Sequence, residues 1–131
     1  MALGYVTTLR NTRLDAITTA AGNAALWDIY DGAKPAIGGA ATTLLAQLTC
    51  GTPFAGAAAA GVLTLSAVTQ DASANNTGTA TWARIKTSGG TVVMDMTAGT
   101  SGTDLILTTA SIVATQPVSI TGSPTITEGN G

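Results

Sequence analysis

Few side chains in this 131-residue chain have the chemistry that catalysis requires. The sequence contains no histidine, which excludes Ser-His-Asp and Cys-His nucleophilic arrangements and also imidazole metal ligands. Histidine is also the commonest general base, so its absence removes that role as well. The remaining candidates are seven carboxylates: Asp15, Asp28, Asp31, Asp71, Asp95, Asp104 and Glu128. We expect a protein that is not an enzyme.

The carboxylates suggest two sites, each weaker than its structural alternative. Asp95 and Asp104 lie on neighbouring expected strands and could act as the acid and base of a glycosidase. Neither belongs to a recognisable active-site motif, so solvated strand ends are the favoured interpretation. Asp28 and Asp31 precede Gly32, but this D-x-x-D-G run lacks the alternating oxygens and distal Glu of a calcium-binding EF-hand.

The other reactive or charged groups predict no cofactor and no nucleic-acid partner. Cys50 is the only cysteine, which rules out an intrachain disulfide and favours a small core residue. No Gly-rich segment is followed by GKS or GKT, so a P-loop is excluded. The net charge is -2, and binding of nucleic acid would require clustered cations. The five cations form no run: Arg10, Arg13, Lys34, Arg84 and Lys86.

Aromatic side chains offer the remaining binding chemistry. Trp27, Tyr30 and Trp82 could build a sugar-stacking platform of the kind that carbohydrate-binding modules use. For Trp27 a place in the core is the favoured interpretation. Trp82 shares a strand face with Arg84 and Lys86, which is also suited to a protein contact, because Trp and Arg anchor interfaces. Core and interface remain open for Trp82.

The stretch from Thr77 to Thr109 is expected to position these residues as a β-meander. Its three strands are separated by Ser88 to Gly90 and by a Gly/Thr/Ser cluster at 97 to 103. Alternation places Trp82, Arg84 and Lys86 on one face of the first strand. The opposite face carries small and apolar residues: Thr79, Thr81, Ala83 and Ile85.

The rest of the chain predicts one helix and further short strands. The helix is expected at 11 to 21, with Asn11 or Thr12 as its N-cap and Gly22 after its last turn. Strands are expected at 5–9, 25–30 with Trp27 inward, 42–49, 62–69, near 112, at 118–120 and at 125–127. Segment 42–49 could also be a short helix, but flanking Thr residues favour a strand. Loops are expected at 53–61 and 71–78, a tight turn at 122–124 and a frayed end at 128–131.

Length and composition predict an all-β protein. Thr, Ala and Gly predominate, which favours many short strands with tight turns. We expect an antiparallel β-sandwich, jelly-roll-like, with residues 1–22 as an N-terminal arm and short helix and 23–131 as a single sandwich domain. Neither a signal peptide nor a membrane-spanning run is recognisable, so synthesis in the cytoplasm and no membrane partner are expected. Charged residues are only 9% of the chain, which suggests surfaces covered by neighbouring subunits.

Five segments carry a resemblance to a known family. They are RNTRLDAI, ALWDIYDGAKP, TGTATWARIKTSGG, GTSGTDLIL and VSITGSPTITEGNG, which begin at residues 10, 25, 77, 99 and 118. Together they resemble head decoration, or cement, proteins of short-tailed bacteriophages of the Bordetella phage type. The resemblance implies a jelly-roll-like sandwich that forms homodimers or homotrimers. It also implies a place in the virion, on the outer capsid surface, where the protein would bridge major capsid proteins and stabilise the shell.

The resemblance supplies no catalytic residue, so contact residues are the expected functional ones. The candidates for capsid or subunit contacts are Tyr5, Leu9, Arg10 and Arg13 in the N-terminal arm, together with Trp82, Arg84 and Lys86. Two alternatives remain open. One is a tail- or fibre-associated virion protein, and the other is a carbohydrate-binding module for host attachment.

Overall fold

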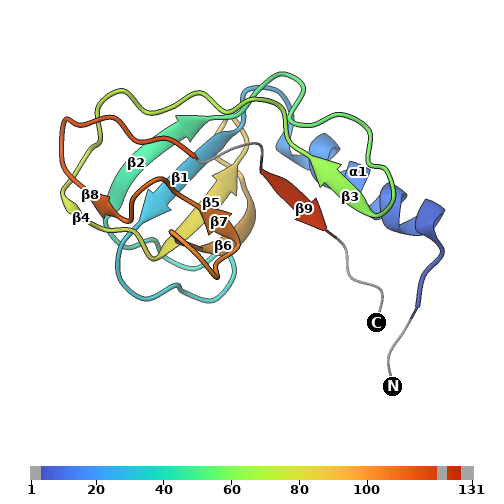
Figure 1. Ribbon diagram of the computed structural model, residues 1–131, viewed down its shortest axis with the longest axis horizontal. Coiled ribbons are helices and arrows are strands. Elements are labelled where there is room, and N and C mark those ends of the chain that lie inside the picture. The colour runs from blue at the N-terminus through green and yellow to red at the C-terminus, as the bar shows by residue number, and fades with distance from the viewer. Residues whose placement is uncertain (1–3, 121–123, 128–131) are drawn as a thin grey trace.

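The computed structural model describes residues 4–120 and 124–127, and this part of the chain is mostly β-structure with a single helix (Figure 1). The helix and strands, in chain order, are α1 (Thr7–Ala21), β1 (Leu26–Tyr30), β2 (Leu44–Thr49), β3 (Val62–Thr64), β4 (Gly78–Thr79), β5 (Trp82–Lys86), β6 (Val92–Gly99), β7 (Leu105–Ile106), β8 (Ser111–Ile112) and β9 (Thr125–Thr127). The turn expected at 122–124 and the end expected to fray at 128–131 lie wholly or partly outside the described residues. The prediction of a β-rich chain with a short N-terminal helix is confirmed.

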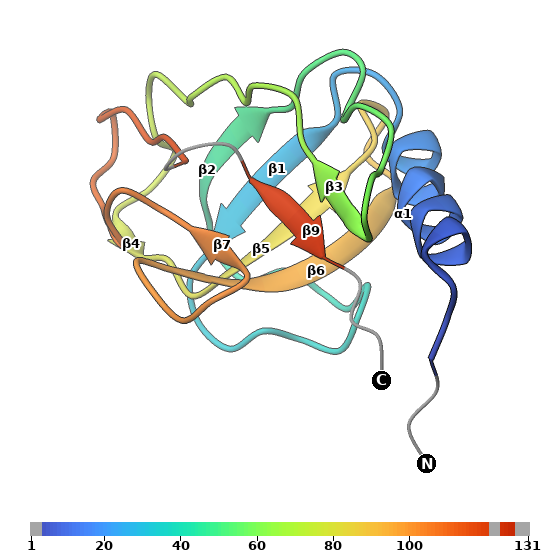
Figure 2. The same ribbon diagram turned by 45° about the vertical axis from the view of Figure 1, so that its right-hand side comes forward.

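A curled central sheet organises the molecule. Its strand order is β2-β1-β5-β6-β7, and all its pairs are antiparallel except β6 with β7. Separate ribbons are formed by β3 with β9 and by β4 with β8. Figure 2 shows the β3–β9 ribbon in front of the central sheet and α1 beside it. Helix α1 packs against β3 and β6.

The expected meander is correct for its first hairpin and wrong for its third strand. β5 and β6 pair antiparallel, and the turn between them is closed by a hydrogen bond from Gly90 N to Thr87 O, with Gly90 at φ 96°. β7 is short and runs parallel to β6. The cause is local, because Asp104 accepts hydrogen bonds from the Thr97 backbone and hydroxyl and so folds the connecting loop back.

Helix α1 begins earlier than its sequence signals indicate. It starts at Thr7 after Val6, so the strand expected at 5–9 is wrong. Asn11 is not a cap, because its side-chain oxygen accepts a hydrogen bond from Gly61 N, 50 residues away. The expected end is confirmed: Gly22 adopts φ 71° and its N–H bonds to Thr18 O.

One face of the central sheet is apolar. Trp27 and Ile29 of β1 lie opposite Ile85 and Ala83 of β5, and all four side chains are buried. Trp27 therefore points inward, as predicted. The expected strand at 62–69 is regular only through Thr64.

The core residues that cover this face come from several parts of the chain. They include Leu14 from α1, Phe54 from the loop at 53–61, Leu63 from β3 and Leu65 just beyond it.

Among the described residues no helix is long and apolar enough to cross a membrane.

Cys50 gives a direct test of this packing. It is buried, as predicted, and burial raises the pKa of its thiol to about 11 from an ordinary value of 9.0. Because the thiolate is the reactive form, we expect the folded chain to react with Ellman's reagent at pH 8 about 100-fold more slowly than the chain unfolded in urea. Equal rates in the two states would show that Cys50 is accessible in the folded chain.

Candidate functional site

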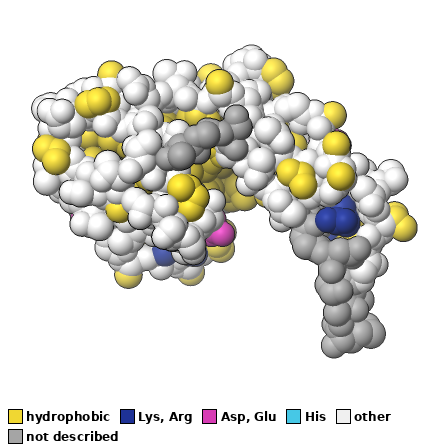
Figure 3. Space-filling view, viewed as in Figure 1, with side chains coloured by type: hydrophobic (Ala, Val, Ile, Leu, Met, Phe, Trp, Pro, Cys, Tyr) yellow, Lys and Arg dark blue, Asp and Glu magenta, His cyan; other side chains and the backbone are white. Residues whose placement is uncertain are grey.

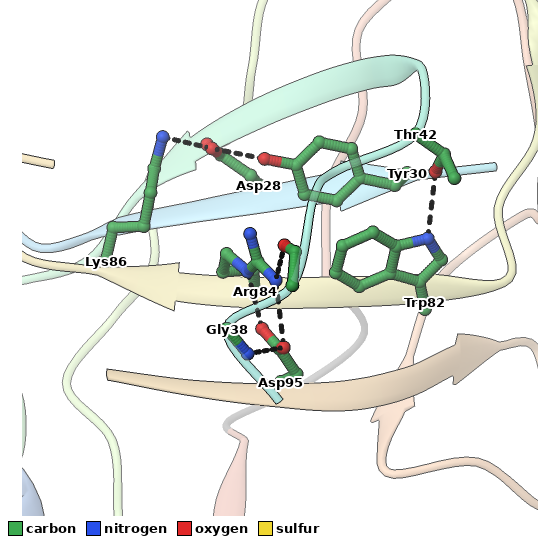
Figure 4. Close-up of polar contacts among 9 residues, drawn as sticks. Asp28, Tyr30, Gly38, Thr42, Trp82, Arg84, Lys86 and Asp95 are labelled. Atoms are coloured by element: carbon green, nitrogen blue, oxygen red, sulfur yellow. Dashed lines mark hydrogen bonds and ion pairs between the residues drawn. The ribbon is translucent and has the colours of Figure 1, made fainter. Parts of the chain in front are cut away.

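The opposite face of the central sheet carries a cluster of polar and aromatic side chains (Figure 4). We define the polar cluster as Asp28 and Tyr30 of β1, Trp82, Arg84 and Lys86 of β5, and Asp95 of β6. Strand register explains why they meet: Arg84 lies directly opposite Asp28 on one side and Asp95 on the other. The alternation predicted for β5 is confirmed, since Trp82, Arg84 and Lys86 share this face.

Arg84 and Asp95 form the centre of the cluster. Arg84 Nε lies 2.6 Å from Asp95 Oδ1, and its Nη2 lies 3.0 Å from Oδ2, so the contact is bidentate. The hydrogen bond between them raises the pKa of Arg84 and, together with a bond from Gly38 N, lowers the pKa of Asp95. Both side chains are almost completely buried. Arg84 Nη2 also donates to Gly39 O at 2.9 Å.

Asp28 organises the other half of the cluster. Its carboxylate receives hydrogen bonds from Tyr30 Oη at 3.0 Å and from Gln47 Nε2 at 2.8 Å, and Lys86 Nζ lies 2.5 Å away. Burial, and next the negative charge of Asp28, raise the pKa of Tyr30 to about 12. Tyr30 is therefore a neutral hydrogen-bond donor at neutral pH.

Trp82 packs against Tyr30 and Arg84 of the polar cluster. Its ring stacks on Tyr30 with centroids 4.3 Å apart, and the Arg84 guanidinium carbon lies 5.1 Å from the centroid of the Trp82 ring. Its Nε1–H donates to Asp31 O and to Thr42 Oγ1, both at 3.0 Å. Because the whole side chain is buried, the open question about Trp82 is answered in favour of the core.

The segment between β1 and β2, residues 31–43, covers the polar cluster. Figure 4 shows this segment crossing over Arg84 and Asp95, with Gly38 donating to Asp95. Trp82 and Arg84 are therefore internal, and they do not form the exposed contact face expected from the sequence. Alternation showed correctly that they share a face, but it carries no information about a distant segment folding over that face. Lys86 keeps 22% of its side chain exposed.

The carboxylates of the catalytic and calcium hypotheses are held in contacts within the fold. Asp95 is ion-paired with Arg84, whereas Asp104 is exposed and accepts a hydrogen bond from the Thr97 hydroxyl. Asp28 is bound by Lys86, and Asp31 accepts a hydrogen bond from Thr43 N. Within residues 4–120 and 124–127, no group of three or more Asp, Glu, Cys or His side chains could hold a metal ion.

The arm residues lie elsewhere, on and before the first turns of α1. The Arg13 guanidinium carbon is 4.8 Å from the centroid of the Tyr5 ring. Arg10 packs so closely on Gly61 that a side chain there would meet its guanidinium. Leu9 is 43% exposed, and the neighbouring Val6, which the sequence did not single out, is 71% exposed. The structure thus groups Tyr5, Leu9, Arg10 and Arg13 but separates them from the polar cluster.

A groove between β6 and β9 was not expected from the sequence. Its volume is about 320 Å³, and Figure 3 shows an apolar recess with an acidic side chain at its rim. The lining residues are Trp27, Ile85, Met94, Asp95, Met96, Asp104, Pro124, Thr125, Ile126 and Thr127. Trp27 is only 3% exposed and Trp82 is fully buried, so the two do not form a surface platform for sugars.

Comparison with protein families, with curated protein sequences and with solved structures finds no match to this chain.

The Arg84–Asp95 pair should respond asymmetrically to substitution. Removing one partner leaves a buried charge, so Arg84→Met should lower the free energy of unfolding by about 3–5 kcal/mol. The double variant Arg84→Met/Asp95→Leu should recover much of this loss, because neither charge remains. Urea denaturation measures both, with Val113→Met, a substitution of an exposed side chain away from the cluster, as control. Additive losses in the double variant would contradict the coupling.

The ion pair of Asp95 should also make the free energy of unfolding fall in acid. Its pKa is lowered from 3.8, mainly by the hydrogen bond from Arg84. The stability that it contributes is complete above its unfolded-state pKa and is lost as the pH falls through its folded-state pKa. We expect Asp95→Asn to flatten the decline of unfolding free energy between about pH 5 and pH 2. Urea denaturation across this range tests it, and Asp15→Asn is the control; the same slope in both variants would refute the assignment.

Proposed function

We propose that this chain is a non-enzymatic structural protein of a bacteriophage particle, a head decoration protein on the outer capsid surface. In this proposal it bridges major capsid proteins, stabilises the shell and associates as a homodimer or homotrimer. The resemblance of five segments along most of the chain supports the family. The surface that we propose for docking to the capsid is based on one observation, the exposed apolar side chains at the start of α1.

The start of α1 has the composition of a contact surface. Val6 and Leu9 expose 71% and 43% of their surface at the start of α1. Figure 1 shows α1 at one end of the molecule. Arg10 and Arg13 flank them on the same helix. Apolar side chains beside Arg are typical of protein interfaces, where the apolar groups leave water and Arg anchors the partner. We define the arm surface as Tyr5, Val6, Leu9, Arg10 and Arg13.

The interior of the protein supports a structural role. The polar cluster is paired within itself and covered by residues 31–43, so its strongest charges hold the fold together. The ribbons β3–β9 and β4–β8 beside the central sheet support a sandwich, and the proposal includes jelly-roll-like connectivity. A rigid, weakly charged domain can then gain stability from binding an assembled lattice.

The arm surface can be tested on particles. Val6→Asp places a charge in the proposed interface, and we expect at least a tenfold weaker binding to expanded heads that lack this protein, or about 1.4 kcal/mol. Co-sedimentation at increasing protein concentration measures the affinity and the number of copies bound. Val113→Asp is a matched control, because Val113 is also an exposed valine, at 50%, outside α1.

Each result of this experiment has a clear meaning. Hundreds of natural copies per head, with weaker binding of Val6→Asp alone, would support both the role and the surface. Equal binding of both variants would reject the arm surface. Absence of binding to heads, with a few copies in each intact virion, would reject decoration and favour the tail- or fibre-associated alternative.

A further inference from the structure

The groove between β6 and β9 is bordered by strand edges as well as by side chains. It is lined by consecutive residues on both strands, 94 to 96 and 125 to 127. Side chains of consecutive strand residues point to opposite faces, so lining by three in a row requires that the strand edge itself faces the groove. The groove can therefore offer backbone N–H and C=O groups to a ligand.

These edges lack strand partners within the described part of the chain. β9 pairs with β3 on one side only. β6 pairs with β5 along its length, but on its other side β7 reaches only Ala98 and Gly99. Unpaired strand edges are templates for another extended chain.

One residue of the groove lining carries a buried donor without an acceptor. Trp27 lines the groove, and only 3% of its surface is exposed. Its Nε1–H has no hydrogen-bond partner among the described residues. Buried indole N–H groups normally find a partner, because an unsatisfied donor is costly away from water. An occupant that supplies a carbonyl oxygen would satisfy it.

The rim of the groove carries an exposed acidic side chain, Asp104. Asp104 is exposed there and accepts hydrogen bonds from Thr97, but it has no ion pair within the described ranges. The other acidic lining residue, Asp95, is neutralised by Arg84. Because no Lys or Arg is among the described residues that line the groove, its rim is suited to a cation.

We propose that this groove binds an extended polypeptide segment of a partner protein, with an apolar side chain next to a Lys or Arg. The apolar side chain would lie among Met94, Met96 and Ile126, and the cation would pair with Asp104. A backbone carbonyl would accept from Trp27, and the strand edges would bond the extended backbone, as in β-strand addition. One ligand class thus accounts for the apolar lining, the orphan donor, the acidic rim and the free edges.

A display selection tests the proposal on the purified full chain, without capsids. Random nonapeptides displayed on mRNA would be selected, and an enriched sequence synthesised for fluorescence anisotropy. We expect enrichment of an apolar residue beside Lys or Arg. Asp104→Asn should weaken binding at least fivefold, and Ile126→Arg should abolish it. The matched controls are Asp15→Asn and Val113→Arg, which should bind as the natural chain does.

A spectroscopic readout locates the bound peptide. On addition of the peptide, the indole N–H signal of Trp27 should shift, whereas that of Trp82, already bonded to Asp31 and Thr42, should stay in place. Amide exchange should slow at Thr125–Thr127. Thermal unfolding of Ile126→Arg is measured in parallel, because a general loss of stability would lower its unfolding temperature. Asp104→Asn, at the exposed rim, provides a second and milder test.

Other outcomes would overturn the proposal. They are failure to enrich any peptide, binding unaffected by both groove variants, or occupation by small apolar amines but not by peptides. Self-association of the natural chain that Ile126→Arg abolishes would assign the groove to a second copy instead. Because no capsid enters these measurements, the groove can fail while the arm surface succeeds, and the reverse.

Discussion

The buried ion pair between Arg84 and Asp95 joins β5 to β6 and is completed by backbone groups of residues 31–43. Removing two charges from water is costly, and their attraction offsets this cost only if the remaining donors and acceptors are also satisfied. Gly38 and Gly39 supply those groups from the segment between β1 and β2. Pairing across β5 and β6 and closure of residues 31–43 are therefore coupled, because each leaves charges unsatisfied without the other.

This closure gives the central sheet two buried faces of different chemistry. The apolar face is held by packing around Trp27 and Ile85, whereas the polar face is held by directed hydrogen bonds around Asp28 and Arg84. Packing is insensitive to direction, but the polar bonds require one register of β1, β5 and β6. We infer that the polar cluster specifies strand register, while the apolar face supplies most of the hydrophobic stabilisation.

The same arrangement determines which parts of the molecule remain for partners. Charges that could have formed a contact face are used inside, and the two surfaces proposed for recognition are the arm surface and the groove between β6 and β9. They belong to different elements, since α1 carries the first and strand edges the second. In the proposed capsid role, such separate surfaces would allow one molecule to contact more than one neighbour.

Local signals determined much of the secondary structure, and contacts between distant segments decided the rest. Gly22 ended α1 because glycine tolerates positive φ, and alternation along β5 placed Trp82 beside Arg84, since side chains in a strand repeat every second residue. Whether that face meets water or another segment depends on residues 31–43, far away in the chain. For the same reason Asn11, a good cap by residue type, instead bonds Gly61. Burial and partnership are properties of the folded chain, because they require atoms that sequence neighbours do not supply.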